Sequence, residues 1–223
     1  MKLALVGPID GNLKKLDSSL PNNIDWCLSS GSVGIWPFLK FMDKPSKQYC
    51  SQDFSELYPK FEGLKHKVLF VRGPHDDNFW INRQLKAKAP EFLPNLVWLS
   101  DGYKTILNEN LKVTGLGGTY SEHYFNTPYK KKIKLKSYRR QHIEKACSSG
   151  KTDILLLHVD PREGKGIDLI IDATLPRLIV HTSKYNKYEE HSYRGVLSVG
   201  LANFKAGIHI CDITKETICL QKL

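Results

Sequence analysis

The chain has 223 residues and a formal net charge of +10, with 33 Lys and Arg against 23 Asp and Glu. At 41% hydrophobic and 25% charged residues, the composition is globular and excludes a disordered tail. No apolar run approaches the ~18 residues of a membrane helix, and the first apolar segment runs directly into a turn, so we expect neither a membrane span nor a signal peptide.

Short aliphatic runs that end at Gly, Pro or a polar residue recur along the chain and predict buried strands. These runs cover residues 2–6, 26–28, 67–71, 96–99, 103–107, 111–116, 153–157, 178–180, 195–199, 206–213 and 217–220. Between them, residues 11–19, 54–64 and 137–148 have the pattern of helices. We expect one α/β domain over residues 1–223, with a mixed sheet or two sheets packed together.

The five cysteines, Cys27, Cys50, Cys147, Cys211 and Cys219, are scattered and contain no CxxC pair. An odd number without metal-ligand spacing favours reduced thiols. We therefore expect an intracellular protein, in the cytoplasm or the nucleus.

Polar residues cluster directly after successive predicted strands. They are Asp10, Ser32, His75 with Asp76, His158 and His181. In open α/β sheets the carboxyl ends of strands form binding sites, so these side chains are candidates for one site. Each taken singly is as well explained as a loop residue or a hydrogen-bonded core group.

The order of these motifs resembles the calcineurin-like metallophosphoesterases and is most similar to the RNA lariat debranching enzymes. The resemblance rests on 8–12 (Pro-Ile-Asp-Gly-Asn), Gly31-Ser32, 73–76 (Gly-Pro-His-Asp), His158 and 180–183 (Val-His-Thr-Ser), and it covers nearly the whole chain. It implies a β-sandwich of mixed sheets flanked by helices. It also implies phosphoester chemistry, in which two metal ions activate a water and neutralise phosphoryl charge.

The chain departs from that family's metal ligands at several positions. Pro8 stands at the first Asp, Ser32 at the bridging Asp, Pro74 at the Asn and Ser183 at the last His. Without the bridging carboxylate the repulsion between two dications is uncompensated, so we expect no two-metal centre. The expectation is no cofactor, or at most one divalent ion (Mn, Fe or Zn) held by His158, His181 and Asp10.

The resemblance assigns His75 to the protonation of the leaving oxygen, with Asp76 as its acidic neighbour. Without metals, His75, His158 and His181 can still bind phosphate as hydrogen-bond donors. The alternative is that they are scaffold residues paired to backbone or water.

A strongly basic stretch spans residues 129–140 and contains two tyrosines. Basic residues neutralise phosphates and aromatic rings stack on unpaired bases, so the stretch favours RNA or another phosphate-bearing partner. The candidate binding residues are Lys130, Lys131, Lys132, Lys134, Lys136, Arg139, Arg140 and, after His158, Arg162. A solvated charge run and a nuclear-localisation signal are the alternatives.

Three functions remain open from the sequence. The first is a catalytically degenerate metallophosphoesterase-fold protein that binds RNA or another phosphorylated partner through a basic face beside the remnant cleft. The second is an active phosphodiesterase or phosphatase with a one-metal or metal-free site. The third is a protein-interaction module, and the oligomeric state is open in all three.

Overall fold

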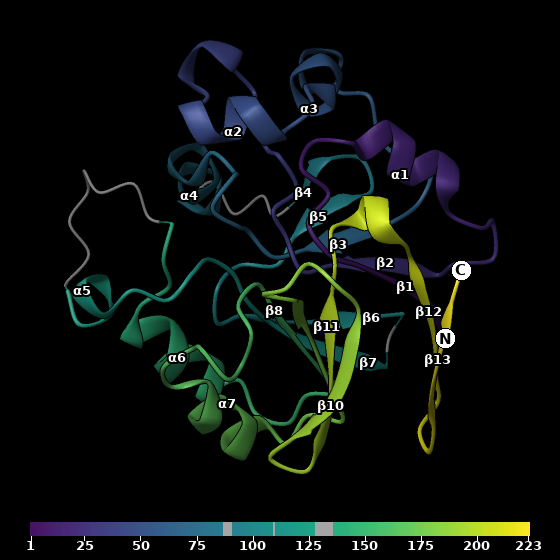
Figure 1. The fold of residues 1–223 in the computed structure, drawn as a ribbon, viewed down its shortest axis with the longest axis vertical. Helices are drawn as coiled ribbons and strands as arrows, with labels where there is room; N and C mark the ends of the chain where they lie inside the picture. Colours follow the sequence, from purple (N-terminus) through teal and green to yellow (C-terminus); the bar gives the residue numbers. More distant parts are fainter. Residues whose placement is uncertain (87–90, 109, 128–135) are drawn as a thin grey trace.

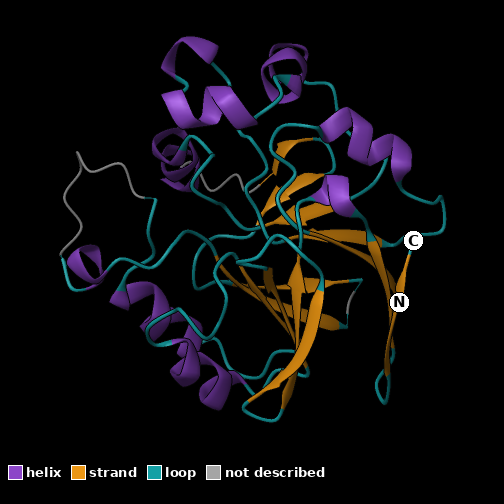
Figure 2. Cartoon of the chain, in the orientation of Figure 1, coloured by secondary structure: helices purple, strands orange, loops and turns teal. Residues whose placement is uncertain are grey.

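The computed structural model describes residues 1–86, 91–108, 110–127 and 136–223, and it consists of two β-sheets packed face to face. Helices cover the outer face of each sheet, as Figures 1 and 2 show. The arrangement confirms the expected mixed α/β class with two mixed sheets flanked by helices.

The first sheet has seven strands in the order β13-β12-β1-β2-β3-β5-β4. Their bounds are β1 Lys2–Val6, β2 Trp26–Ser29, β3 Val68–Phe70, β4 Glu91–Leu93, β5 Leu96–Trp98, β12 His209–Ile213 and β13 Ile218–Lys222. Strands β1, β2, β3 and β5 are mutually parallel, whereas β12, β13 and β4 add antiparallel edges. The carboxyl ends of β1, β2 and β3 therefore lie side by side.

The second sheet has six strands in the order β10-β11-β9-β8-β7-β6. Their bounds are β6 Lys104–Leu107, β7 Leu111–Leu116, β8 Ile154–Leu157, β9 Leu178–Thr182, β10 Glu189–Tyr193 and β11 Val196–Leu201. Strands β7, β8, β9 and β11 are parallel, and β6 and β10 close the edges antiparallel. Strand β10 has the sequence Glu-Glu-His-Ser-Tyr, which lacks the aliphatic run that identified the other strands.

Helices α1–α4 lie over the first sheet, and α6 and α7 over the second (Figure 1). Their bounds are α1 Leu13–Ser19, α2 Lys44–Tyr49, α3 Asp53–Leu57, α4 Asn78–Lys86, α5 Glu122–Phe125, α6 Arg140–Cys147 and α7 Ile167–Thr174, with short 3-10 turns at Leu39–Phe41, Tyr58–Lys60 and Phe204–Ala206. No helix among the described residues combines the length and apolar character needed to cross a membrane.

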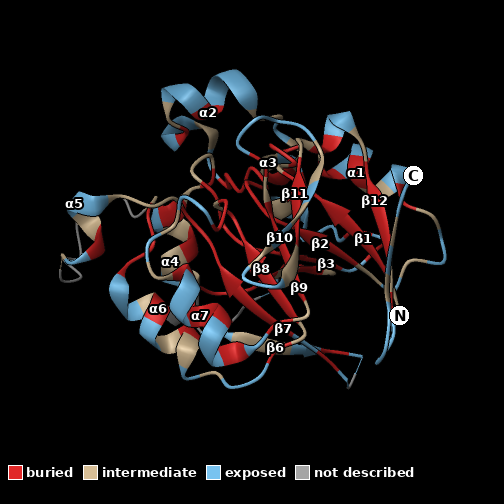
Figure 3. Ribbon diagram, turned by 60° about the horizontal axis from the view of Figure 1, so that its bottom comes forward, coloured by how far each residue is buried: buried red, intermediate tan, exposed pale blue. Residues whose placement is uncertain are grey.

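Strand alternation divides the apolar residues into three layers. On β1, Leu3 and Leu5 face the second sheet, whereas Ala4 and Val6 face helices α1 and α3. On β9, Val180 packs between the sheets and Ile179 packs under α6 and α7. The central strands are the buried elements in Figure 3, whereas the edge strands β10 and β13 are intermediate or exposed and the helices expose their outer faces. This period of two decides which polar residue at each strand end faces which layer.

Candidate functional site at the strand ends

The carboxyl ends of parallel strands from both sheets meet at one edge of the sandwich. Ser30, which follows β2, lies 2.8 Å from Thr182 at the end of β9, oxygen to oxygen. The backbone carbonyl of Ser30 lies 2.8 Å from Nδ1 of His158, which follows β8. We call the group formed by Asp10, Ser32, His75, His158 and Thr182 the strand-end site.

His75 is held at this site by a carboxylate from the neighbouring strand end. Its Nδ1 lies 3.2 Å from Oδ1 of Asp10, and Asn203 donates to the other Asp10 oxygen at 2.8 Å. Tyr49 stacks on the imidazole with ring centroids 5.5 Å apart. The hydrogen bond to Asp10 raises the pKa of His75 above its ordinary value, although burial opposes this.

Asp76 shapes the backbone around the site. Its buried carboxylate accepts hydrogen bonds from the backbone N–H groups of Val33, Gly34, Ile35 and Gly73, at 2.6–3.1 Å for the shortest contact of each. Burial raises the pKa of Asp76 to about 6, although the N–H donors oppose the shift. The carboxylate thereby fixes the loop after β2 to the turn after β3. The acidic group in contact with the His75 ring is Asp10.

His158 faces the same edge in its neutral form. Its Nδ1–H donates to the carbonyl groups of Ser30 and Gly31, at 2.8 and 3.1 Å. Burial lowers the pKa of His158 below its ordinary value. The bond to the backbone fixes the Nδ1–H tautomer, so Nε2 carries the lone pair.

His181 lies on the opposite face of β9 from the strand-end site. Its neighbour Thr182 bonds to Ser30 and to the Gly31 carbonyl at the junction of the sheets. Because adjacent strand residues point to opposite faces, the His181 ring lies on the helix-covered side. There it belongs to a second cluster with Asp160 and His191. The structure thus separates His181 from Asp10 and His158, its predicted companions in a one-ion site.

The described part of the chain contains two groups of three possible metal ligands, and within each group the ligand atoms lie within 4.8 Å of one another. One group is Asp10 with Cys50 and His75, and the other is Asp160 with His181 and His191. Two ions do not fit at the strand ends. Pro8, Ser32 and Pro74 supply no carboxylate or imidazole, so the donor set there is limited to Asp10, Cys50 and His75. Burial and nearby carboxylates also raise the pKa of Cys50, which keeps its thiol protonated.

The predicted basic residues that the structure describes already have partners. Lys136 pairs with Asp43 at 2.7 Å, and Arg140 pairs with Glu144 at 3.1 Å on the surface of α6. Arg139 is buried and donates to the Thr127 carbonyl. Arg162 bonds to Asp160 and, at 3.1 Å, to Glu189. The other four candidates, Lys130, Lys131, Lys132 and Lys134, lie outside the described residues.

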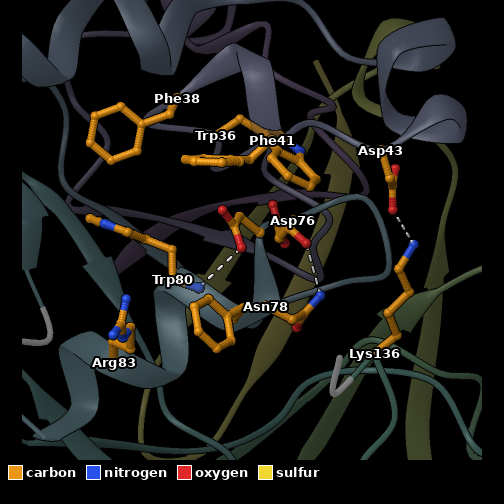
Figure 4. Close-up of a pocket in the computed structure, with 11 residues that line it drawn as sticks. Trp36, Phe38, Phe41, Asp43, Asp76, Asn78, Trp80, Arg83 and Lys136 are labelled. Carbon is orange, nitrogen blue, oxygen red and sulfur yellow. Dashed lines mark hydrogen bonds and ion pairs between the residues drawn. The ribbon is translucent and has the colours of Figure 1, made fainter. Parts of the chain in front are cut away.

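An aromatic pocket of 440 Å³ opens beside the Asp76 turn (Figure 4). Its aromatic wall is Trp36, Phe38, Phe41, Phe79 and Trp80, and its charged residues include Arg83 and the Lys136–Asp43 pair. Half or more of Phe38, Phe41 and Phe79 is exposed to solvent. Trp36 donates its indole N–H to the His75 carbonyl at 2.6 Å, which couples the pocket wall to the strand-end site.

Several residues of these sites escaped sequence reasoning. Asn203 and Cys50 come from distant segments without a motif, and His191 lies on the polar edge strand β10. Asp160 was also missed, although it had a local signal, because it lies two residues after His158 at the end of the same strand. The local signs of the pocket are the run 36–41, with aromatic residues at three of its six positions, and the adjacent pair Phe79 and Trp80.

No protein-family model matches the sequence, and no curated protein matches it at a significant level. Solved structures do match. TT1561 of Thermus thermophilus has a TM-score of 0.62 at 14% identity, over 99% of this chain and 98% of that one. Vps29 of Chaetomium thermophilum has a TM-score of 0.40 at 12% identity, over 100% and 97% of the two chains. The fold is therefore metallophosphoesterase-like, as the sequence motifs indicated.

Proposed function

We propose that the chain is a catalytically degenerate relative of the lariat debranching enzymes that binds RNA at the strand-end site and the aromatic pocket beside it. The observation that carries the proposal is the Asp10–His75 pair. A carboxylate at a strand end, where the fold family holds metal ions, is here hydrogen-bonded to the imidazole of His75 instead, and that bond favours the protonated ring. Such a group binds a phosphate by a charge-assisted hydrogen bond and needs no metal ion.

The aromatic pocket supports RNA over a phosphorylated protein. Exposed Phe and Trp rings stack on unpaired bases, and base–aromatic stacking contributes about 1–3 kcal/mol per base. A pocket of 440 Å³ is within the range of ligand sites. Trp36 joins this pocket to the backbone of His75, so one nucleotide can place its base and its phosphate on the two adjoining features.

RNA binding is expected to respond to the pocket aromatics. We expect Phe38→Ala and Phe41→Ala each to weaken the affinity for a labelled single-stranded RNA about tenfold, because each removes a stacking surface. Phe61→Ala is the matched control, since Phe61 is equally exposed but lies outside the pocket. Fluorescence anisotropy at ~50 mM salt measures the affinities, and a wild-type protein with no affinity there would favour a protein-interaction module.

Salt dependence tests the basic stretch separately. Replacing Lys130, Lys131, Lys132 and Lys134 by Ala is expected to reduce the slope of log affinity against log salt by about 0.7 for each phosphate that is no longer neutralised. The measurement is the same anisotropy titration at several salt concentrations. An unchanged slope would remove this segment from the proposed interface and leave the pocket as the binding surface.

His75 gives the binding a pH dependence. Its pKa is raised in the folded protein, so the cation is present at acidic pH and is lost as pH rises through that pKa, which lies above 6.5. RNA affinity is therefore expected to fall as pH rises from about 6 to 8, and to lose this dependence in His75→Gln. A pH profile identical in His75→Gln and wild type would contradict a phosphate contact at His75.

The alternative function is an active phosphodiesterase, and a turnover assay distinguishes it from the degenerate protein. With Mn²⁺ and a panel of phosphodiesters, we expect no turnover above the buffer control, because the donor set fits no two-metal centre. Turnover that is abolished by His158→Ala in a folded sample would establish the altered-site enzyme instead.

A further inference from the structure

A pair of histidines lies on the helix-covered face of the second sheet, away from the strand-end site. His181 on β9 is fully buried, and the half-buried His191 comes from the edge strand β10. Their rings are edge to face with centroids 5.7 Å apart. Asp160, from the loop after β8, completes a group whose ligand atoms all lie within 4.8 Å of one another.

The strand register explains how side chains from β9 and β10 meet across the intervening β11. Gly200 on β11 pairs with His181 on one side and with Glu189 on the other. A Cβ at Gly200 would lie 3.0 Å from His181 Cε1 and 2.7 Å from Glu189 Cγ. The glycine therefore leaves the space that the imidazole and the carboxylate occupy.

Three buried nitrogens in this cluster have no hydrogen-bond partner among the described residues: His181 Nε2 and both ring nitrogens of His191. Each unsatisfied buried polar group costs about 1–3 kcal/mol. His181 Nδ1 lies 3.0 Å from the Thr182 carbonyl, which fixes the Nδ1–H tautomer and leaves a lone pair on Nε2. Metal-ligating histidines are oriented by the same kind of bond from the other ring nitrogen to a backbone carbonyl.

We propose that Asp160, His181 and His191 bind one divalent transition-metal ion, Zn²⁺ by preference. Two imidazoles and a carboxylate are ligands typical of zinc. Tetrahedral coordination at about 2.1 Å separates ligand atoms by about 3.4 Å, and the three ligand atoms of this cluster all lie within 4.8 Å of one another. The site is separate from the strand-end site and does not depend on RNA binding.

Charges around the cluster favour a cation. Asp160 and Glu189 are the acidic groups. The Arg162 guanidinium bonds to both Asp160 oxygens and to Glu189, so it has to release one Asp160 oxygen when the ion binds. Lys184 also lies near Asp160 and is paired with Glu163. Burial opposes the ionisation of Asp160, but the bonds from Arg162 hold its pKa below the ordinary value. The local charge before metal binding is about −1.

The ion would clamp the edge strand β10 to the loop after β8. That loop begins at His158, whose ring donates to the Ser30 and Gly31 carbonyls at the sheet junction. Metal binding is therefore expected to hold this loop in place where it leaves the carboxyl end of β8.

Metal titration of the full chain tests the site. When Zn²⁺ is added back to chelator-treated protein and the excess is removed, we expect one Zn²⁺ per chain by elemental analysis. Co²⁺ added in its place should give the intense visible bands of a tetrahedral site. Saturating Zn²⁺ should raise the thermal midpoint by roughly 5–10 °C, as expected for a 200-residue protein at about 100 times the dissociation constant. His191→Ala and Asp160→Asn should each weaken Zn²⁺ binding by about 100-fold.

Two controls make the result decisive. His123→Ala removes an exposed histidine on α5, and His75→Ala removes a member of the other ligand group. Both should bind Zn²⁺ as the wild type does. Binding that His75→Ala abolishes and His191→Ala leaves intact would overturn the proposal in favour of the strand-end group, and a wild type that retains no Zn²⁺ and shows no thermal shift would overturn it outright.

Discussion

Asp76→Ala is expected to lower the free energy of unfolding by about 3–5 kcal/mol, because it leaves four buried backbone N–H groups without an acceptor. These donors are the N–H groups of Val33, Gly34, Ile35 and Gly73, which lie on two separate loops of the site. Urea unfolding at pH 7, followed by tryptophan fluorescence, measures the change.

Asp25→Ala is the matched control for this variant. Asp25 is exposed and accepts a single backbone bond, from Lys2 at 2.7 Å. Water replaces that acceptor, so we expect a loss within about 1 kcal/mol. An Asp76→Ala protein as stable as Asp25→Ala would show that the Asp76 carboxylate does not hold the site loops together.

Arg72→Met should destabilise the fold by a similar amount, about 3–5 kcal/mol, because it removes the guanidinium that pairs with the buried Asp101 carboxylate. Arg72 lies two residues after the end of β3 and is 1% exposed. Its Nε lies 2.7 Å from Asp101, which in turn accepts from the Gly117 N–H after β7 at 2.8 Å. The pair thus connects the first sheet to the second. Chemical denaturation measures how much this connection contributes to the free energy of unfolding.

Arg140→Met is the control for Arg72→Met, since the Arg140–Glu144 pair lies on the surface of α6. We expect a change within about 0.5 kcal/mol. If Arg72→Met does not fold, the double variant Arg72→Met with Asp101→Leu should recover folding, because neither charge then remains buried alone. A double variant no more stable than Arg72→Met would refute the buried-charge explanation.

The strands of the core were predictable because each is an aliphatic run closed by a turn residue. The run at 111–116 coincides with β7, and that at 2–6 with β1. Strand β10 was missed because an edge strand with one solvated face needs no such run. Helix α7, Ile167–Thr174, was missed although its four buried residues lie at helical spacing, at positions 167, 170, 171 and 174.

Residue types and their order along the chain were sufficient for the fold class, for the order of the site motifs and for the lack of carboxylate or imidazole ligands at Pro8, Ser32 and Pro74. Which side chains meet depends instead on how the strands pack in three dimensions. The His75 ring is hydrogen-bonded to Asp10 and not to Asp76. His181 lies with Asp160 and His191 and not at the strand-end site. The cause is that successive residues of a strand point to opposite faces of the sheet, so a shift of one residue moves a side chain to the other face. The register at Gly200 on β11 also sets which residues of β9 and β10 lie on either side of it.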